Sequence, residues 1–412
     1  MEQHLRSALP LYAAVFIDLF SFGLMYPVII VLFHQPAIEA MYSPAFLSVL
    51  LSLAFSLYPF GMFFGAALLG DISDAFGRRR TLLICMSGLA AAYLLMLIGV
   101  ETEVLVWLLA GRLLSGLMAG TSPIAQAAMM DHSTERNRGT NMSHVVLVNC
   151  VALVSGPAAG GVLAHIDVRA PFVFAIGLCL LILAWIYSGA DLREGKNRML
   201  HLSWRRPFEV FVEAWRQPAL RGLASAFFLF QFGFAIYYVY ILVRMSNDYG
   251  LTPSGLGLFS GLMGVGFVVG STLLYAQAKR YLSRDGLVAM LGLALCGGIV
   301  LAAALPLGAA LQWLLAFLAC STNLLAFVGL LTLISASADA GKQGWALGIS
   351  AAMVALSFFL SGLFASTLAL LPLPWLIALG GLIVLAGLIP LRAAMRGVPA
   401  GFGPTAGDRL SP

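Results

Sequence analysis

The chain has 412 residues, of which 61% are apolar and 10% are charged, and its formal net charge is +5. Soluble globular proteins carry about 25% charged residues, so this composition excludes an ordinary soluble domain and indicates that most of the chain faces lipid or other apolar helices. The positive charge does not indicate nucleic-acid binding, because the basic residues lie in short segments between apolar runs and form no basic-aromatic patch.

Apolar blocks recur twelve times along the chain, and most of them contain the roughly 20 residues that a helix needs to cross a bilayer. Runs this long and this uniform favour helices over barrel strands. We therefore predict an all-α membrane protein with twelve transmembrane helices in two six-helix bundles. The predicted spans are residues 8–33, 46–70, 80–100, 103–130, 142–165, 170–190, 219–243, 254–278, 285–306, 309–337, 344–371 and 373–395.

The distribution of basic residues predicts the orientation of the chain. Of the 23 Lys and Arg, all but Arg112, Arg169 and Arg244 fall in segments on the same side of the membrane as the N-terminus. Because positive residues mark the cytoplasmic side, we expect both termini in the cytoplasm and a multi-pass protein of the bacterial inner membrane. The first apolar run is long and lacks a cleavage site, which favours a retained span over a removed signal peptide.

The longest polar interval divides the chain. We predict an N-terminal bundle over residues 1–190, a cytoplasmic linker over 191–221, a C-terminal bundle over 222–396 and a disordered tail over 397–412. Within the linker, apolar residues repeat with helical spacing among charged ones, which favours an amphipathic helix on the inner membrane face over a disordered segment. The apolar residues are Phe208, Phe211, Val212 and Trp215.

Asp18 is the one acidic residue deep within a predicted span. A charged Asp at mid-bilayer costs about 2.5–3.5 kcal/mol on insertion scales, so we expect Asp18 to face the protein interior or a watery cavity. Desolvation favours the neutral acid there. A carboxyl group that changes its protonation with substrate suits proton coupling or substrate binding. The alternative is a structural hydrogen bond near the cytoplasmic end of the span.

Arg112 is the one cation clearly within a span. Arg stays charged, so it cannot simply carry a proton, but it can hold a carboxylate or bias the protonation of one. Gly116 and Gly120 follow four and eight residues later, which predicts close helix contact on that face. The alternative is a structural anchor near the outer leaflet.

Span five contains the run from Gly156 to Gly161, with glycines at 156, 160 and 161 and a proline at 157. Pro157 removes a helical hydrogen bond and is expected to bend the span, while the glycines allow a neighbouring helix to approach.

Aromatic and amide residues in spans one and seven predict the lining of a central substrate cavity, although ordinary helix packing is the alternative. These residues are Phe22, Tyr26, Gln231, Tyr237 and Tyr238. The five cysteines lie inside apolar runs without a CxxC pair, so we expect no metal site, no disulfide and no cofactor.

Four of these segments, in this order on twelve spans, resemble the major facilitator superfamily, and within it the drug–proton antiporters that include the tetracycline exporters. The first is the span-one run from Asp18 to Pro27. The second is Gly70-x-x-x-Asp74-x-x-Gly77-Arg78-Arg79 between spans two and three. The third is the span-four run from Gly111 to Gly116, and the fourth is the Gly-Pro-x-x-Gly-Gly run of span five.

The resemblance implies roles for these residues. It implicates Arg112 in proton coupling and makes the span-five run an antiporter signature, which symporters of the superfamily usually lack. One departure is that a glycine usually found upstream of that run is Asn149 or Ala152 here. It also implies a cytoplasmic gate that latches the outward-facing state, for which a purely topological role of the charges is the alternative. The gate residues are Gly70, Asp74, Gly77, Arg78 and Asp131.

The sequence thus predicts a proton-coupled secondary transporter, expected as a monomer in lipid, that exports amphipathic small molecules by alternating access between its halves. The alternative is an importer or porter of a metabolite or siderophore with the same fold. A membrane enzyme is not expected, because Asp18 and Arg112 alone are polar enough and deep enough for catalysis.

Overall fold

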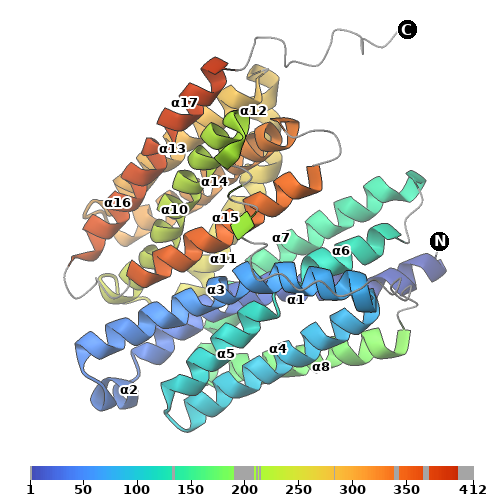
Figure 1. Cartoon of the computed structure of the whole chain (residues 1–412). Coiled ribbons are helices and arrows are strands. Elements are labelled where there is room, and N and C mark those ends of the chain that lie inside the picture. The colour runs from blue at the N-terminus through green and yellow to red at the C-terminus, as the bar shows by residue number, and fades with distance from the viewer. Residues whose placement is uncertain are drawn as a thin grey trace.

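The computed structural model of the chain (Figure 1) describes residues 2–131, 135–189, 208–209, 212, 215–282, 284–337, 343–364 and 371–397. The side chains of residues 2–8, 130–131, 135–140, 142–143, 189, 218–219, 343–348 and 397 lie outside that description. The part of the chain that the structure describes contains helices and no strands. This agrees with the predicted all-α class.

The helices follow one another with short connections, and successive long helices run in opposite directions (Figure 1). In the first half they are α1 (Glu2–Phe33), α2 (Pro36–Met41), α3 (Pro44–Phe76), α4 (Arg78–Glu101), α5 (Leu105–Leu117), α6 (Thr121–Asp131), α7 (Glu135–Ile166) and α8 (Ala170–Gly189). In the second half they are α10 (Pro218–Asn247), α11 (Pro253–Val269), the π-helix η1 (Gly270–Leu274), α12 (Tyr275–Tyr281), α13 (Asp285–Ala304), α14 (Ala309–Ser337), α15 (Gln343–Leu363), α16 (Leu373–Ala386) and α17 (Leu388–Gly397).

Eleven helical stretches in the described residues are long and apolar enough to cross a membrane. They correspond to ten of the predicted spans and to the last one, over Leu373–Arg396. At the predicted eleventh span, α15 has 21 residues, and its described apolar part, Ile349–Leu363, is shorter than the other eleven stretches. The prediction of a multi-pass helical membrane protein is therefore confirmed, while the count of twelve stays a prediction.

Helices of each half pack mainly with one another. In the first half, α1 lies against α7, α6 and α8, and α4 lies against α5 and α8. In the second half, α10 lies against α16 and α15, and α13 lies against α14 and α16. Two helix pairs join the halves most extensively, namely α7 with α11 and α3 with α15.

Both inter-half crossings depend on glycine. A Cβ at Gly161 of α7 would lie 2.5 Å from the Pro253 carbonyl oxygen of α11, so only glycine allows this approach. A Cβ at Gly362 of α15 would lie 2.5 Å from Ser56 Oγ of α3. Gly161 lies five residues before the end of α7, and Gly362 lies one residue before the end of α15. We call this side, where α1 ends at Phe33, the far face, and the side where α1 begins the near face.

Few described residues belong to the predicted linker. Positions 208, 209, 212, 215 and 216 are helical, and the ring of Phe208 lies 5.4 Å from that of Phe63 on α3. Phe208 therefore contacts the first bundle. The rest of the predicted amphipathic helix, and the predicted tail beyond Gly397, lie outside the described residues.

Candidate functional site

Span four is interrupted, which corrects the expectation of one continuous helix over 103–130. Helix α5 ends at Leu117, the chain turns through Met118–Gly120, and a second helix, α6, begins at Thr121. The turn is held by the Gly120 N–H, which donates to the Met118 carbonyl at 2.9 Å. The sequence held the signal for this break, because Thr-Ser-Pro at 121–123 is typical of a helix start.

The carboxylate of Asp18 lies at this break. Its Oδ2 accepts a hydrogen bond of 3.0 Å from the backbone N–H of Ser122, the second residue of α6. A carboxylate at a helix N-terminus satisfies an otherwise unpaired donor and interacts favourably with the helix dipole. Asp18 is half-buried. The sequence prediction that Asp18 faces the interior agrees with this position, and the hydrogen bond shows what it faces.

Arg112 is almost fully buried, with 1% of its surface exposed. Its Nε donates to the Ala54 carbonyl at 2.9 Å, and its guanidinium carbon lies 4.9 Å from the ring centroid of Tyr58. A desolvated cation–π contact of this kind is worth about 2 kcal/mol. Within the described residues no ion pair joins Arg112 to Asp18. Arg112 is therefore held by a carbonyl and a ring, and one of its terminal nitrogens, Nη2, has no hydrogen-bond partner.

Four aromatic rings close into a cycle between the halves. The centroid distances are 5.0 Å between Phe22 and Tyr26, 5.4 Å between Tyr26 and Tyr238, 5.9 Å between Tyr238 and Phe358, and 5.6 Å between Phe358 and Phe22. Three of these rings belong to the predicted cavity set, and Phe358 of α15 was not predicted. The cycle joins α1 of one half to α10 and α15 of the other, so it must open if the halves separate there.

Two other residues of the predicted cavity set lie apart from this cycle. Tyr237 is fully buried, contacts Phe234 and lies near Cys296 and Cys320 within the second half. Its neighbour Tyr238 projects from a different side of the helix and reaches the cycle, although both rings contact Phe234. Gln231 lies on α10, with 4% of its surface exposed.

The predicted gate residues lie at the near face, where α3 meets α4. Arg78 Nη1 forms an ion pair of 2.7 Å with Asp74 and donates to Ser73 Oγ at 2.8 Å. Gly77 separates the two helices with φ +98°, a conformation that favours glycine. A Cβ at Gly70 would meet nothing within 4 Å, so packing does not require glycine there. The side chain of Asp131 lies outside the described residues.

The span-five glycines bring α7 into contact with two helices. A Cβ at Gly156 would lie 2.5 Å from the Phe20 carbonyl oxygen of α1, and one at Gly160 would collide with the Leu24 carbonyl of the same helix. Gly161 faces α11 of the other half, as described above. Pro157 packs on Gly23 of α1, where a Cβ would lie 2.6 Å from the proline Cδ. The run therefore fixes span five against the helix that carries Asp18.

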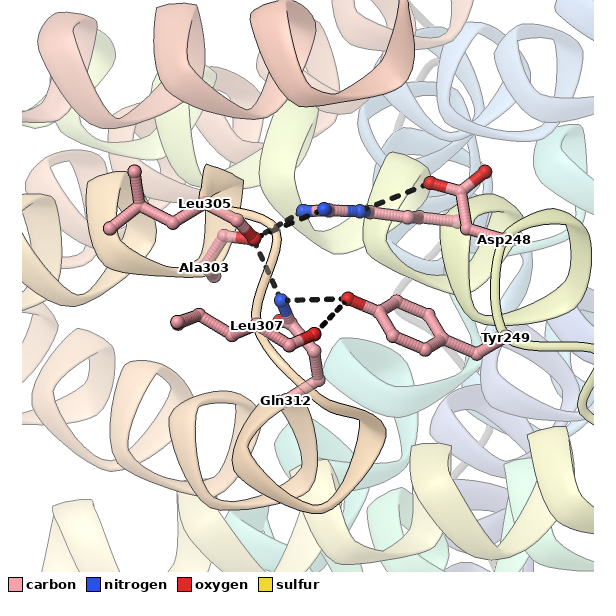
Figure 2. A network of polar contacts seen from close by, with 7 residues as sticks. Asp248, Tyr249, Ala303, Leu305, Leu307 and Gln312 are labelled. Atoms are coloured by element: carbon pink, nitrogen blue, oxygen red, sulfur yellow. Dashed lines mark hydrogen bonds and ion pairs between the residues drawn. The ribbon is translucent and has the colours of Figure 1, made fainter.

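A buried polar network at the far face was missed by the sequence reasoning, which placed Arg244 in an outer loop. The Arg244 side chain donates to Ala303 O at the end of α13 at 2.5 Å and to Leu305 O in the following loop at 3.1 Å. Figure 2 shows these two acceptors together with Asp248, Tyr249 and Gln312. The hydroxyl of Tyr249 donates to Leu307 O at 2.5 Å. The signal was Asp248 four residues after Arg244, which forms an ion pair of 3.3 Å with it.

The first half carries a simpler version of this network. There the hydroxyl of Tyr42 donates to Glu103 O at 3.4 Å, so in each half a tyrosine from the first loop bonds to a carbonyl of the third loop. In the first half the loop charges form an exposed ion pair, Glu101 with Arg169 at 3.1 Å. The two halves thus share a hydrogen bond between the first and third loops. They differ in that the nearby charged residues are exposed in the first half, whereas Arg244 is buried in the second.

Replacing Arg244 with alanine is expected to lower the thermal midpoint of the detergent-solubilised protein by several degrees. Hydrogen bonds to charged groups are worth about 1.5–3 kcal/mol each, and Arg244 makes one to a buried carbonyl and one to a partly buried carbonyl. The matched control is Arg169→Ala, which removes a half-exposed ion pair worth about 0–1 kcal/mol. Equal midpoints for the two variants in a thermal unfolding scan would contradict this prediction.

Comparisons with known proteins identify the family of this chain. The family model of the Major Facilitator Superfamily matches residues 9–362. The chain belongs to the major facilitator superfamily. Superfamily members are membrane transporters rather than enzymes.

Several relatives of this superfamily member are named as resistance proteins. It is 27% identical over 297 residues to "Tetracycline resistance protein, class C" of Escherichia coli, which covers 70% of this chain and 71% of the relative. It is 30% identical over 226 residues to "Tetracycline resistance protein, class G" of Vibrio anguillarum, 54% of each chain. "Multidrug resistance protein 2" of Bacillus subtilis is 24% identical over 235 residues, covering 56% of this chain and 57% of that one.

Solved structures share the fold at low identity. A POT family transporter in complex with 5-aminolevulinic acid has a TM-score of 0.74 at 12% identity, covering 95% of this chain and 96% of that one. A D-xylose-proton symporter has a TM-score of 0.72 at 15% identity, covering 94% and 97%. These likenesses show the superfamily fold alone, since transporters of different cargo share it.

Proposed function

We propose that this member of the superfamily is a drug–proton antiporter that exports amphipathic small molecules from the cytoplasm. The observation that carries the proposal is the tight span-five run, in which Gly156 and Gly160 press on α1 and Gly161 presses on α11. The kinship with tetracycline and multidrug resistance proteins supports it further. In this proposal twelve spans form two six-helix bundles, and both termini lie in the cytoplasm of a bacterial cell.

With that orientation the near face is cytoplasmic. The glycine crossings at Gly161 and Gly362 lie toward the far face. The described arrangement then corresponds to a state closed to the outside, from which alternating access requires these crossings and the aromatic cycle to open. Asp18 would exchange the proton, and Arg112, held by the Ala54 carbonyl and the Tyr58 ring, would act as a fixed positive charge in the same half.

The gate residues would act at the cytoplasmic face. We expect Asp74→Ala to shift the population of conformations toward inward-open, because the resemblance makes Asp74 part of a latch that holds the outward-facing state. In the described arrangement Asp74 forms an ion pair of 2.7 Å with Arg78 of the next helix. Accessibility of single cysteines from each face, on a cysteine-free background, measures the shift. Unchanged accessibility together with unchanged transport would leave the gate charges with a topological role only.

The second candidate is an importer or porter with the same fold, favoured by the likeness to a D-xylose-proton symporter. The two are separated by a substrate screen in proteoliposomes with an imposed pH gradient of each sign. An antiporter moves its cargo against the direction of proton flow, and a symporter moves it with the protons. Tetracycline and a lipophilic dye such as ethidium are the first probes to use.

A further inference from the structure

We propose that Asp18 is the releasable cap of a half-helix, α6, and that proton binding to Asp18 frees this half-helix to move relative to α5 during transport. The inference rests on the proposed proton coupling and names α6 as the element that moves when Asp18 binds a proton. It begins from the break in span four and from the hydrogen bond of 3.0 Å between Asp18 Oδ2 and the Ser122 N–H.

The first step concerns the donors at the start of α6. Pro123 has no N–H, and the Ile124 N–H donates to the Gly120 carbonyl at 3.3 Å. The Ser122 N–H is the donor that a group outside the helix satisfies, and that group is the Asp18 carboxylate. Inside a bilayer an unsatisfied backbone donor costs several kcal/mol, so this bond contributes to holding the start of the half-helix in place.

The second step concerns the two parts of span four, which are held very differently. Helix α5 is pressed on α3 through backbone contacts, because Cβ atoms at Gly61 and Gly65 would collide with the backbone of residues 113–117, and one at Gly116 with the backbone of Tyr58. Helix α6 contains no glycine and packs on α1, α4 and α3, and a Cβ at Gly120 before it would lie 2.8 Å from the side chain of Leu69. The break therefore separates a helix that is held by close backbone contacts at glycines from one whose start is held by Asp18.

The third step concerns what a proton does to the cap. Charge-assisted hydrogen bonds are about twice as strong as neutral ones, and a negative charge at a helix N-terminus adds a favourable interaction with the dipole. When a proton from the water-filled side forms the O–H bond on Asp18, both gains are lost, and the Ser122 N–H keeps at most a neutral acceptor. Proton binding thus weakens the hold on α6 and leaves α5 in place.

Other groups around Asp18 do not replace it in this role. Tyr58 on α3 and Tyr93 and Cys85 on α4 are the titratable groups around Asp18 on these two helices, and they are phenols and a thiol rather than carboxyl groups. The described side chains of α7 and α8, which also pack on α1, include no carboxyl, Lys or Arg group. The carboxyl group of Asp18 is therefore the switch at the start of α6.

The test measures distances in the full-length protein in proteoliposomes, without any substrate. On a cysteine-free background, spin labels at Ala127→Cys of α6 and Leu94→Cys of α4 report the position of α6. The pair Leu113→Cys of α5 and Leu94→Cys is the control. Electron paramagnetic resonance distance distributions are recorded at about pH 8 and about pH 5, on either side of the range where a carboxyl in the membrane interior titrates.

We expect the α6 pair to change its distance distribution between the two pH values and the α5 pair to keep it. Asp18→Asn, neutral at both pH values, should give the low-pH distribution throughout. Ser122→Ala removes only the hydroxyl that accepts from Gln126 and keeps the N–H, so it should behave like the wild type. A distribution that is the same at both pH values, or that still responds to pH in Asp18→Asn, overturns the inference.

The result is independent of whether the protein exports a drug. A pH-dependent movement of α6 in a protein that transports none of the probes would refute the proposed cargo and keep the switch. Proton-driven export in a protein whose α6 does not move would keep the proposed function and refute the switch.

Discussion

Replacing Asp18 with asparagine is expected to abolish proton-driven transport while exchange of substrate for substrate continues. Asparagine matches the shape of the carboxyl group and can still accept the hydrogen bond from Ser122, but it cannot take up a proton. Exchange needs the halves to alternate without net proton movement, so it survives. Proteoliposomes that contain a pH-sensitive dye and a substrate from the screen measure both processes, and proton movement should fall to the level of empty liposomes.

The matched control for this result is Asp167→Asn. Asp167 lies in an exposed turn after α7, where its carboxylate accepts from the Arg169 N–H at 2.8 Å. This variant removes one acidic group from the surface and should transport protons as the wild type does. Normal proton movement in Asp18→Asn would remove Asp18 from the coupling mechanism and return it to a purely structural hydrogen bond.

The sequence predicted the spans because lipid imposes a simple rule of length and polarity on each helix separately. The break in span four escaped that rule, since the run from 103 to 130 is apolar enough on average to cross a membrane and hydropathy does not register a turn of three residues. The local signal was Thr-Ser-Pro at 121–123. A helix start in the middle of a bilayer needs a partner for its donors, and Asp18 was the one acidic residue deep enough to provide it.

Contacts between the halves could not be derived from single spans. Phe358 joins the aromatic cycle because α15 crosses α3 at Gly362, and this crossing depends on how two helices from opposite halves of the chain dock. The burial of Arg244 was missed for a related reason. Its position at a span end fits an outer loop, but only 3% of its surface is exposed, since carbonyls of the loop between α13 and α14 surround it.

The direction of transport is the prediction that most affects the functional conclusion. We expect cells that express the protein to accumulate less of a lipophilic compound such as ethidium, and a protonophore to restore the accumulation. The physical reason is that an antiporter couples the inward flow of protons to the outward movement of cargo. Uptake of the fluorescent dye by intact cells, with and without the protonophore, measures the effect.

Gly156→Leu is expected to eliminate this export. A Cβ at this position already lies 2.5 Å from the Phe20 carbonyl oxygen, so a leucine forces α7 away from α1 and disturbs the helix that carries Asp18. Gly177→Leu on α8 is the matched control, because a Cβ there meets nothing within 4 Å, and it should export normally. The membrane content of each variant is measured by immunoblot, and Gly156→Ala, with a smaller intrusion, separates loss of function from loss of folding. Export by Gly156→Leu at the wild-type rate would remove the span-five contact from the mechanism.

The direction of transport has its own contradicting outcome. Cells that accumulate a cargo more strongly as the proton gradient grows would show that the importer alternative is correct, because a symporter couples inward protons to inward cargo.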